Sequence, residues 1–350
     1  MAYVFAIVGL SLLIIVHELG HMWVARLSGM RVETFSVGFG PALVRWRGRR
    51  TVYQIALIPL GGYVQIAGMN PHEEIEPDDP GSYANKGALA RIGTIVAGPL
   101  TNYVASSLLI IGIALAWGEP DWQHAVGLVQ EGSPAARAGL AKGDQIEAID
   151  GKKTPNIEDV IHGIQGGGGK ASRLTVRRGE RRVELTVTPE KQKDEDSYRI
   201  GVGFSRKLAF SGISAGAAVR YGLEYPLVQA QRGLSALGQL FDKLFQGDLS
   251  GAKQMGGVVE IVYQLSASFR ESTALALMFL AMLSAWLALL NLLPVPALDG
   301  GRLLFLIVGA VLRRPINQRV EHAIHTVGFL LLVGLLLLVT YCDVARRMGP

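Results

Sequence analysis

Cysteine is nearly absent from this chain, since Cys342 is the only one in 350 residues. A single thiol excludes an internal disulfide framework and a zinc site built on cysteines. Charge is scarce as well: 18% of the residues are charged, 49% are hydrophobic and the mean hydropathy is +0.30. This composition is too apolar for an ordinary soluble protein, so we expect a membrane protein. The net charge of +5 then reflects cytoplasmic loops, and we expect no nucleic acid among the partners.

The first apolar segment lacks the marks of a signal peptide. No Lys or Arg precedes Arg26, and no small-residue cleavage site follows the apolar core, so we expect the segment to stay as a helix. Four stretches reach the roughly 20 residues that a transmembrane helix needs. They are about residues 2–25, 92–117, 273–295 and 323–342. The apolar run 303–312 is too short to cross and suits a buried or interfacial helix.

Positive charge predicts the orientation of these spans. Arginines gather in two loops, residues 26–91 and residues 299–321, which should therefore be cytoplasmic. The first carries Arg26, Arg31, Arg45, Arg47, Arg49 and Arg50, and the second carries Arg313, Arg314 and Arg319. The N-terminus, the region between the second and third spans, and the C-terminus then lie outside. Arg346 and Arg347 near the C-terminus count weakly against this orientation.

Two regions between the spans have patterns of their own. In the first loop, residues 52–58 and 63–66 alternate as strands around a Pro-Leu-Gly-Gly turn, which predicts a β-hairpin within residues 31–70. Residues 121–205 have the pattern of a soluble insert with a hairpin of its own. Residues 206–272 have helical periodicity but are too polar to span. They suit either an amphipathic helix at the membrane surface or a helix packed in the insert.

The first span contains the motif His17-Glu18-Leu19-Gly20-His21. Histidines four residues apart share one helix face and can hold zinc, while the glutamate between them handles a proton. A carboxylate and two imidazoles are costly at membrane depth, which makes them a functional hypothesis. The alternative, two helix histidines satisfied by their neighbours, would bury polar groups at a cost of several kcal/mol if they were unpaired. The motif predicts metal-assisted hydrolysis within a membrane.

A catalytic zinc site also needs a third protein ligand and an open position for water. The stretch from Asn291 to Gly301 ends the third span, and its two prolines break the helix just before Asp299. Irregular backbone at membrane depth is tolerated beside protein or a watery cavity, which favours Asp299 as the ligand. A helix-ending loop with Asp299 as a cap explains the same residues. The rival ligands are Glu33, His322 and His325.

Several motifs in a fixed order resemble the site-2 intramembrane zinc metalloproteases, especially the bacterial branch called regulator of sigma-E protease. Besides the histidine motif, the matching pieces are Val37-Gly38-Phe39-Gly40, Pro59-Leu60-Gly61-Gly62-Tyr63-Val64, Ala97-Gly98-Pro99-Leu100-Thr101-Asn102, Asn291 to Gly301, and Cys342-Asp343-Val344-Ala345-Arg346. The resemblance implies that one Zn²⁺ is bound by His17, His21 and Asp299 and that Glu18 is the general base. It also implies that Asn102 and Asn291 position the substrate, and that the protein is located in the bacterial inner membrane.

The stretches 132–140 and 143–151 resemble a circularly permuted PDZ domain, whose peptide groove would include Gly127, Leu128 and Val129. The expected fold is a polytopic α-helical membrane protein with about four transmembrane helices, a membrane-associated β-hairpin and an inserted α/β PDZ domain. The expected domains are a membrane core at 1–120, the PDZ domain at 121–205, extracytoplasmic amphipathic helices at 206–272 and a second membrane core at 273–350. Two features depart from the family: a single PDZ domain, and Gln254-Met255-Gly256-Gly257-Val258 in place of a Gly-Pro pair.

The function implied by the resemblance is proteolysis within the membrane. The substrates would be single-span proteins, such as an anti-sigma factor or signal-peptide remnants, and the hairpin at 52–66 would offer an edge strand that holds them extended. The PDZ domain would bind a peptide or C-terminus, act as a size filter, or serve only folding. Two functions compete. A membrane-tethered peptidase for soluble peptides would take its third ligand from the soluble loop, and a scaffold or chaperone with structural zinc would tolerate Glu18→Gln.

Overall fold

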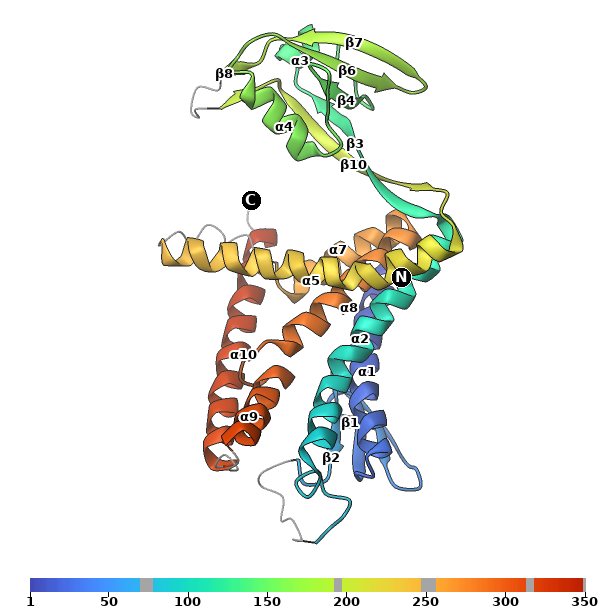
Figure 1. The fold of residues 1–350 in the computed structure, drawn as a ribbon, viewed down its shortest axis with the longest axis vertical. Helices are drawn as coiled ribbons and strands as arrows, with labels where there is room; N and C mark the ends of the chain where they lie inside the picture. The colour runs from blue at the N-terminus through green and yellow to red at the C-terminus, as the bar shows by residue number, and fades with distance from the viewer. Residues whose placement is uncertain (70–77, 192–196, 247–255, 313–317, 349–350) are drawn as a thin grey trace. The chain divides into compact units, whose positions relative to one another are not determined.

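The computed structural model describes residues 1–69, 78–191, 197–246, 256–312 and 318–348 (Figure 1). Two compact units make up the chain, one of residues 1–116 with 213–350 and one of residues 117–212. Among the described residues, four helices of the first unit are long and apolar enough to cross a membrane, the number predicted. They are α1 (Ala2–Leu27), α2 (Ala88–Trp117), α8 (Thr273–Leu292) and α10 (Gln318–Met348). Arg313 and Arg314, used above for orientation, lie outside the described residues.

Small residues let three of these helices pack closely. A Cβ placed on Gly20 of α1 would lie only 2.4 Å from the carbonyl oxygen of Ala97 on α2. Ser106 of α2 donates a hydrogen bond to a carbonyl of α8 at 2.7 Å, and Ser284 of α8 donates one to a carbonyl of α2 at 2.9 Å. Close backbone approach and interhelical hydrogen bonds are what hold helices together in lipid, where burial of apolar surface contributes little.

The third span ends in a loop that leads directly into another helix, α9 (Asp299–Leu312). Two glycines after Asp299 let this loop fold back against the start of α9. A Cβ on Gly300 would lie 2.1 Å from the carbonyl oxygen of Leu293, and one on Gly301 would lie 2.5 Å from that of Val295. Side chains at these two positions would push the loop away and displace Asp299.

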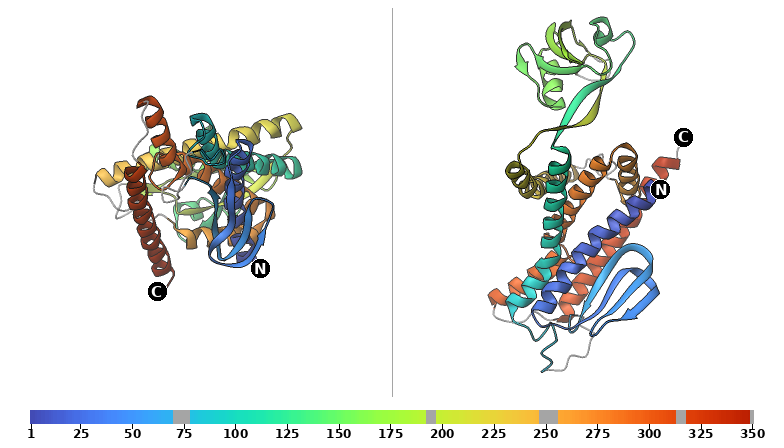
Figure 2. Two further views of the ribbon diagram at one scale, coloured as in Figure 1. Left: turned by 90° about the horizontal axis from the view of Figure 1, so that it is seen from below. Right: turned by 90° about the vertical axis from the view of Figure 1, so that its right-hand side faces the viewer.

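The chain between α1 and α2 forms a small antiparallel sheet of β1 (Val32–Arg47) and β2 (Val52–Ile66). Figure 2 shows this sheet beside α1. The first part of β1, residues 34–37, pairs with residues 62–65 on one side and with residues 52–55 on the other. Residues 42–47 then pair with the far side of residues 52–56. Among the described residues, the two edges of the sheet are therefore 62–66 and 42–47.

This pairing differs from the predicted hairpin. Residues 52–58 and 63–66 do not pair across the Pro-Leu-Gly-Gly turn, because the first part of β1 lies between them. Ile55 consequently pairs with both Val37 and Val44 and belongs to a central strand, so only residues 62–66 can act as an edge strand next to α1.

Two further helices belong to the first unit. They are α5 (Ala215–Phe245) and α7 (Val258–Glu271), and α5 runs crosswise to α2 in Figure 1. Tyr103 of α2 donates its hydroxyl proton to a carbonyl of α5 at 2.7 Å. The start of α7 is capped by Asp343 of α10, whose carboxylate accepts from the amides of Gly257 at 2.8 Å and Glu260 at 3.3 Å. Gln254 and Met255, noted above as a departure from the family, lie outside the described residues.

The second unit is an α/β structure with its own hydrophobic core. The four-stranded sheet has the order β5-β4-β6-β7, and two two-stranded sheets pair β3 with β10 and β8 with β9. The strands are β3 (Glu119–Val129), β4 (Gln145–Ile149), β5 (Lys152–Lys153), β6 (Ser172–Arg178), β7 (Arg181–Val187), β8 (Glu190–Lys191), β9 (Tyr198–Arg199) and β10 (Val202–Ser211). The helices are α3 (Pro134–Arg137) and α4 (Ile157–Gly166). The unit extends beyond the expected 121–205 because β3 and β10 stay paired from Glu119 and Ser211 onward.

An ion pair between a buried carboxylate and a partly exposed arginine connects the loop before β4 to β6. Arg178 donates two hydrogen bonds to Asp144, at 2.7 and 2.8 Å. Burial of the carboxyl group acts to raise the pKa of Asp144, but the hydrogen bonds from Arg178 and from the Ala141 amide outweigh it and hold this pKa below its ordinary value. Asp144 is therefore charged at neutral pH and ties the loop before β4 to the end of β6.

Candidate metal centre

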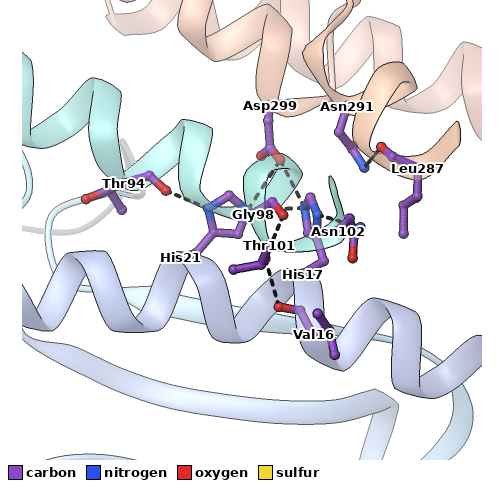
Figure 3. A network of polar contacts seen from close by, with 10 residues as sticks. All are labelled: Val16, His17, His21, Thr94, Gly98, Thr101, Asn102, Leu287, Asn291 and Asp299. Carbon is purple, nitrogen blue, oxygen red and sulfur yellow. Dashed lines mark hydrogen bonds and ion pairs between the residues drawn. The ribbon is translucent and has the colours of Figure 1, made fainter. Parts of the chain in front are cut away.

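Three side chains from two distant parts of the chain meet in the first unit (Figure 3). His17 and His21 lie one turn apart on α1, and Asp299 begins α9. The Asp299 carboxylate lies 3.0 Å from Nε2 of His17 and 3.3 Å from Nε2 of His21, and the two Nε2 atoms are 3.2 Å apart. We call these residues the His–His–Asp cluster.

The cluster has the donor set and the spacing of a zinc site. Zinc–nitrogen and zinc–oxygen bonds of 2.0–2.2 Å in a tetrahedron imply donor atoms about 3.3 Å apart. The observed separations of 3.0 to 3.3 Å match that distance. Among the described residues, no fourth His, Cys, Asp or Glu joins the three, which leaves one tetrahedral position for water. The residues present therefore fit a catalytic zinc ion.

Hydrogen bonds behind the histidines orient both rings. Nδ1 of His21 lies 2.7 Å from the carbonyl oxygen of Thr94, so it carries the proton and leaves the Nε2 lone pair directed at the cluster. His17 contacts the amide of Asn102 at 3.2 Å through Nδ1. Asn102 is fully buried, and its Oδ1 otherwise has no partner. With the amide turned so that Oδ1 accepts a hydrogen bond from Nδ1–H of His17, His17 has the same tautomer as His21, and the amide NH2 group takes the buried position without a partner.

Helix α2 approaches the histidines closely because it has a glycine there. A Cβ on Gly98 would lie 2.2 Å from Nε2 of His21 and 2.8 Å from Cε1 of His17. The hydroxyl of Thr101 lies 3.0 Å from the carbonyl oxygen of Val16 and ties α2 to α1 at this level. The close approach of α2 to α1 thus depends on Gly98, which has no side chain and lies beside the two histidines.

Glu18 lies beside the cluster but points toward the small sheet. Its carboxylate accepts a hydrogen bond from the backbone amide of Val64 in β2. A Cβ on Gly62 would lie 3.8 Å from Cγ of Glu18, so the edge strand 62–66 passes next to this carboxylate. The arrangement places one carboxylate, free of the cluster, between the candidate metal position and a strand edge.

Comparison with known proteins identifies the family. The sequence model of peptidase family M50 matches residues 5–335, a range that includes the whole His–His–Asp cluster. The chain belongs to peptidase family M50. A Clostridium perfringens protein named zinc metalloprotease is 32% identical over 344 residues, 98% of each chain. One from Clostridium acetobutylicum is 30% identical and covers 97% of this chain and 96% of its own. The regulator of sigma-W protease from Bacillus subtilis is 27% identical and covers 95% of this chain and 96% of its own.

As a member of family M50, this chain is a zinc-dependent metallopeptidase of the site-2 protease type. The structure keeps the rival ligands away from the cluster. Glu33 lies in an ion pair with Arg31 and accepts a hydrogen bond from Gln65. Neither His322 nor His325 belongs to the group of donor atoms at the cluster.

The other predicted site residues of this M50 protein make contacts outside the His–His–Asp cluster. Asn291 lies near the cluster in Figure 3, but its amide donates to the carbonyl of Leu287 in its own helix at 3.0 Å. In the second unit, a groove of about 650 Å³ lies between α4 and the paired ends of β3 and β10. Of the three predicted groove residues, Leu128 lines it, Val129 packs on the core, and Gly127 lies close to Ser205 instead.

Two residues at the site were missed by the sequence reasoning. Thr94 contributes a backbone carbonyl, which any residue type would supply, so no sequence signal marks it. Gly98 belongs to a motif shared with the family and had no predicted role of its own, although a Gly-Pro pair inside an apolar span indicates a close helix contact.

Proposed function

We propose that this M50 peptidase cuts peptide bonds within the membrane, with zinc held by His17, His21 and Asp299 and with Glu18 as the general base. The observation that carries the proposal is the His–His–Asp cluster itself. Its donor atoms lie within 4.8 Å of one another, and two of its three members belong to a helix long and apolar enough to span. The reaction would then take place at membrane depth rather than in a soluble domain.

The chain's own residues account for the proton transfers. Bound zinc lowers the pKa of water to about 7 and polarises a carbonyl group. Glu18 accepts the proton of the attacking water and returns it to the departing amine, a role worth about 10²–10⁴-fold in rate. Thr94 and Asn102 keep the histidine tautomers fixed.

The edge strand 62–66 suits an extended substrate. A transmembrane helix hides its peptide bonds in its own hydrogen bonds, so it must unwind before hydrolysis. Residues 62–66 pair with β1 on one side only and pass beside Glu18. The Val64 amide of this edge already donates to Glu18. An unwound segment can add to the same edge as a further strand, which would hold its backbone next to the general base.

Cross-linking tests the strand model. Gln65→Cys places a thiol on the proposed docking edge, and Val44→Cys places one on the opposite edge as a matched control. Both are made with Cys342→Ser and Glu18→Gln, so that no native thiol competes and the substrate stays uncut. We expect disulfides from Gln65→Cys to a cysteine near the scissile bond, at several times the yield from Val44→Cys. Equal yields at both edges would contradict strand addition.

The second unit is proposed to be a PDZ domain that receives a peptide. Its groove of about 650 Å³ is lined by Leu128 on β3, by Ile161 and Ile164 on α4 and by Phe204 on β10. An extended segment with an apolar side chain suits such a groove between a helix and strand ends. We further propose that the substrates are single-span membrane proteins, an anti-sigma factor among them, since the Bacillus relative is a regulator of sigma-W protease.

The proposed location is the bacterial inner membrane, with the N-terminus, the PDZ domain and the C-terminus outside the cytoplasm. The arginines of β1 and of the turn after it, Arg45, Arg47, Arg49 and Arg50, support a cytoplasmic position for the small sheet.

A direct test compares two substrates with the protein in lipid nanodiscs. One is a single-span protein with a short outer domain, and the other is a soluble peptide with the same cleavage sequence. We expect the first to be cut, the activity to disappear with a chelator, and added zinc to restore it. Cleavage of the soluble peptide alone would favour the membrane-tethered peptidase instead.

A further inference from the structure

A strained residue lies two positions before Asp299. Ala297 has φ +73°, in the left-handed region that residues with a Cβ rarely adopt. Among the described residues, only Ala297 and Asp150 combine a side chain with positive φ. Such a conformation persists only where the surroundings hold it in place, and it is often found at functional sites. The contact that holds Ala297 is therefore relevant to Asp299.

The backbone amide of Ala297 donates a hydrogen bond to Nδ1 of His325 at 2.9 Å. His325 comes from α10, the last span, and its ring also packs against Phe305 of α9 with the ring centroids 5.6 Å apart. Nδ1 accepts a hydrogen bond here, so the ring is neutral with its hydrogen on Nε2. His325 was weighed above as a rival ligand, but in the structure it holds the loop that carries the ligand.

The loop and α10 are in close contact at Gly328. A Cβ on Gly328 would lie 2.4 Å from Cβ of Pro296. Beside that point, an apolar cavity of about 480 Å³ separates Val295 and Pro296 from the next turns of α10. In its most apolar window, none of α10 is buried. The hydrogen bond from Ala297 is the directional polar contact that joins α10 to the loop beside this cavity.

We propose that His325 is a positioning residue for Asp299. By accepting a hydrogen bond from the amide of Ala297, it stabilises the left-handed turn of the loop and sets the direction in which Asp299 enters the cluster. The zinc site then depends on where α10 lies, although α10 supplies no ligand. This inference rests on the proposed function, because it takes Asp299 to be a zinc ligand.

The test is a zinc titration of full-length protein in detergent against a chromophoric chelator. His325→Leu keeps an apolar side chain of similar bulk but has no acceptor. His325→Asn keeps an acceptor, since its Oδ1 occupies the place of Nδ1. His322→Ala, one turn away on the same helix, is the matched control. We expect zinc affinity to fall about tenfold for the leucine variant, as for other residues that orient metal ligands, and to stay within about twofold for the other two.

A second substitution separates positioning from packing. Glycine adopts positive φ freely, so Ala297→Gly should restore most of the affinity lost in His325→Leu. Wild-type affinity in His325→Leu, or the absence of rescue by both Ala297→Gly and His325→Asn, would overturn the inference. Asp299→Ala in the same titration distinguishes a failure of the positioning role from a failure of the proposed ligand set. If it loses zinc while His325→Leu does not, only the positioning role is wrong; if it keeps zinc, the proposed ligand set and the inference are both wrong.

Discussion

Replacing Glu18 with glutamine is expected to abolish cleavage of a single-span substrate while zinc stays bound. Glutamine has the size of glutamate and can still contact the Val64 amide through its side-chain oxygen, but it cannot accept a proton from water. Loss of a general base lowers rates by about 10²–10⁴-fold. The cluster donors come from three other residues, so the bound zinc should not change. Cleavage and zinc content are measured on the same preparation.

Glu33→Gln provides the matched control for this experiment. Glu33 lies near the start of β1, in an ion pair with Arg31 and away from the cluster. The same chemical change there should leave both cleavage and zinc nearly unaltered. Continued cleavage in Glu18→Gln would remove the general-base role, and loss of activity in Glu33→Gln would revive the soluble-loop ligand of the tethered peptidase.

The spans were the part of the fold most open to prediction, because lipid requires long runs of apolar residues. Their ends were less so. The third span stops at Leu292, earlier than hydropathy suggested, because Leu293 takes an extended conformation ahead of Pro294. The strand pairing was not predictable either. Alternation predicts strands at 52–58 and 63–66 but says nothing about the partner between them, which comes from β1.

The candidate site was also predictable only in part. His17 and His21 stand out because polar groups in an apolar helix are costly, and Asp299 stands out beside two prolines. The role of the residues that orient them could not be predicted, although Asn102 was expected near the site as a substrate-positioning residue. Thr94 acts through its backbone, and Asn102 contacts His17 from a fully buried position rather than from an open face. His325 had a recognisable side chain but an unpredictable role, since the φ of Ala297 appears only in the folded chain.

The close approach of α2 to α1 explains why a glycine is central to this site. The histidines of α1 face α2 as well as Asp299, so the room around the zinc position is set by α2. A side chain at Gly98 would occupy that room, because its Cβ would lie 2.2 Å from Nε2 of His21. The neighbour is a ring fixed by the Thr94 carbonyl and cannot swing aside without losing that bond.

Gly98→Ala is therefore expected to lower zinc affinity tenfold or more and to remove most of the cleavage activity. The added methyl group forces either His21 to rotate or α2 to move away, and both separate donor atoms that now lie 3.0 to 3.3 Å apart. Alanine is a better helix former than glycine by about 1 kcal/mol, so the helix itself is not weakened. Zinc is measured by competition with a chelator, and helix content by circular dichroism.

Gly112→Ala, in the same helix, makes this prediction specific. A Cβ on Gly112 would meet no atom within 4 Å, so the substitution changes helix propensity and nothing at the cluster. It should leave zinc binding and cleavage unchanged. If Gly98→Ala also bound zinc normally, α2 would have to yield by more than an ångström at a point where Thr101 and Gly20 hold it against α1. That result would mean that the close approach of α2 is not what shapes the metal site.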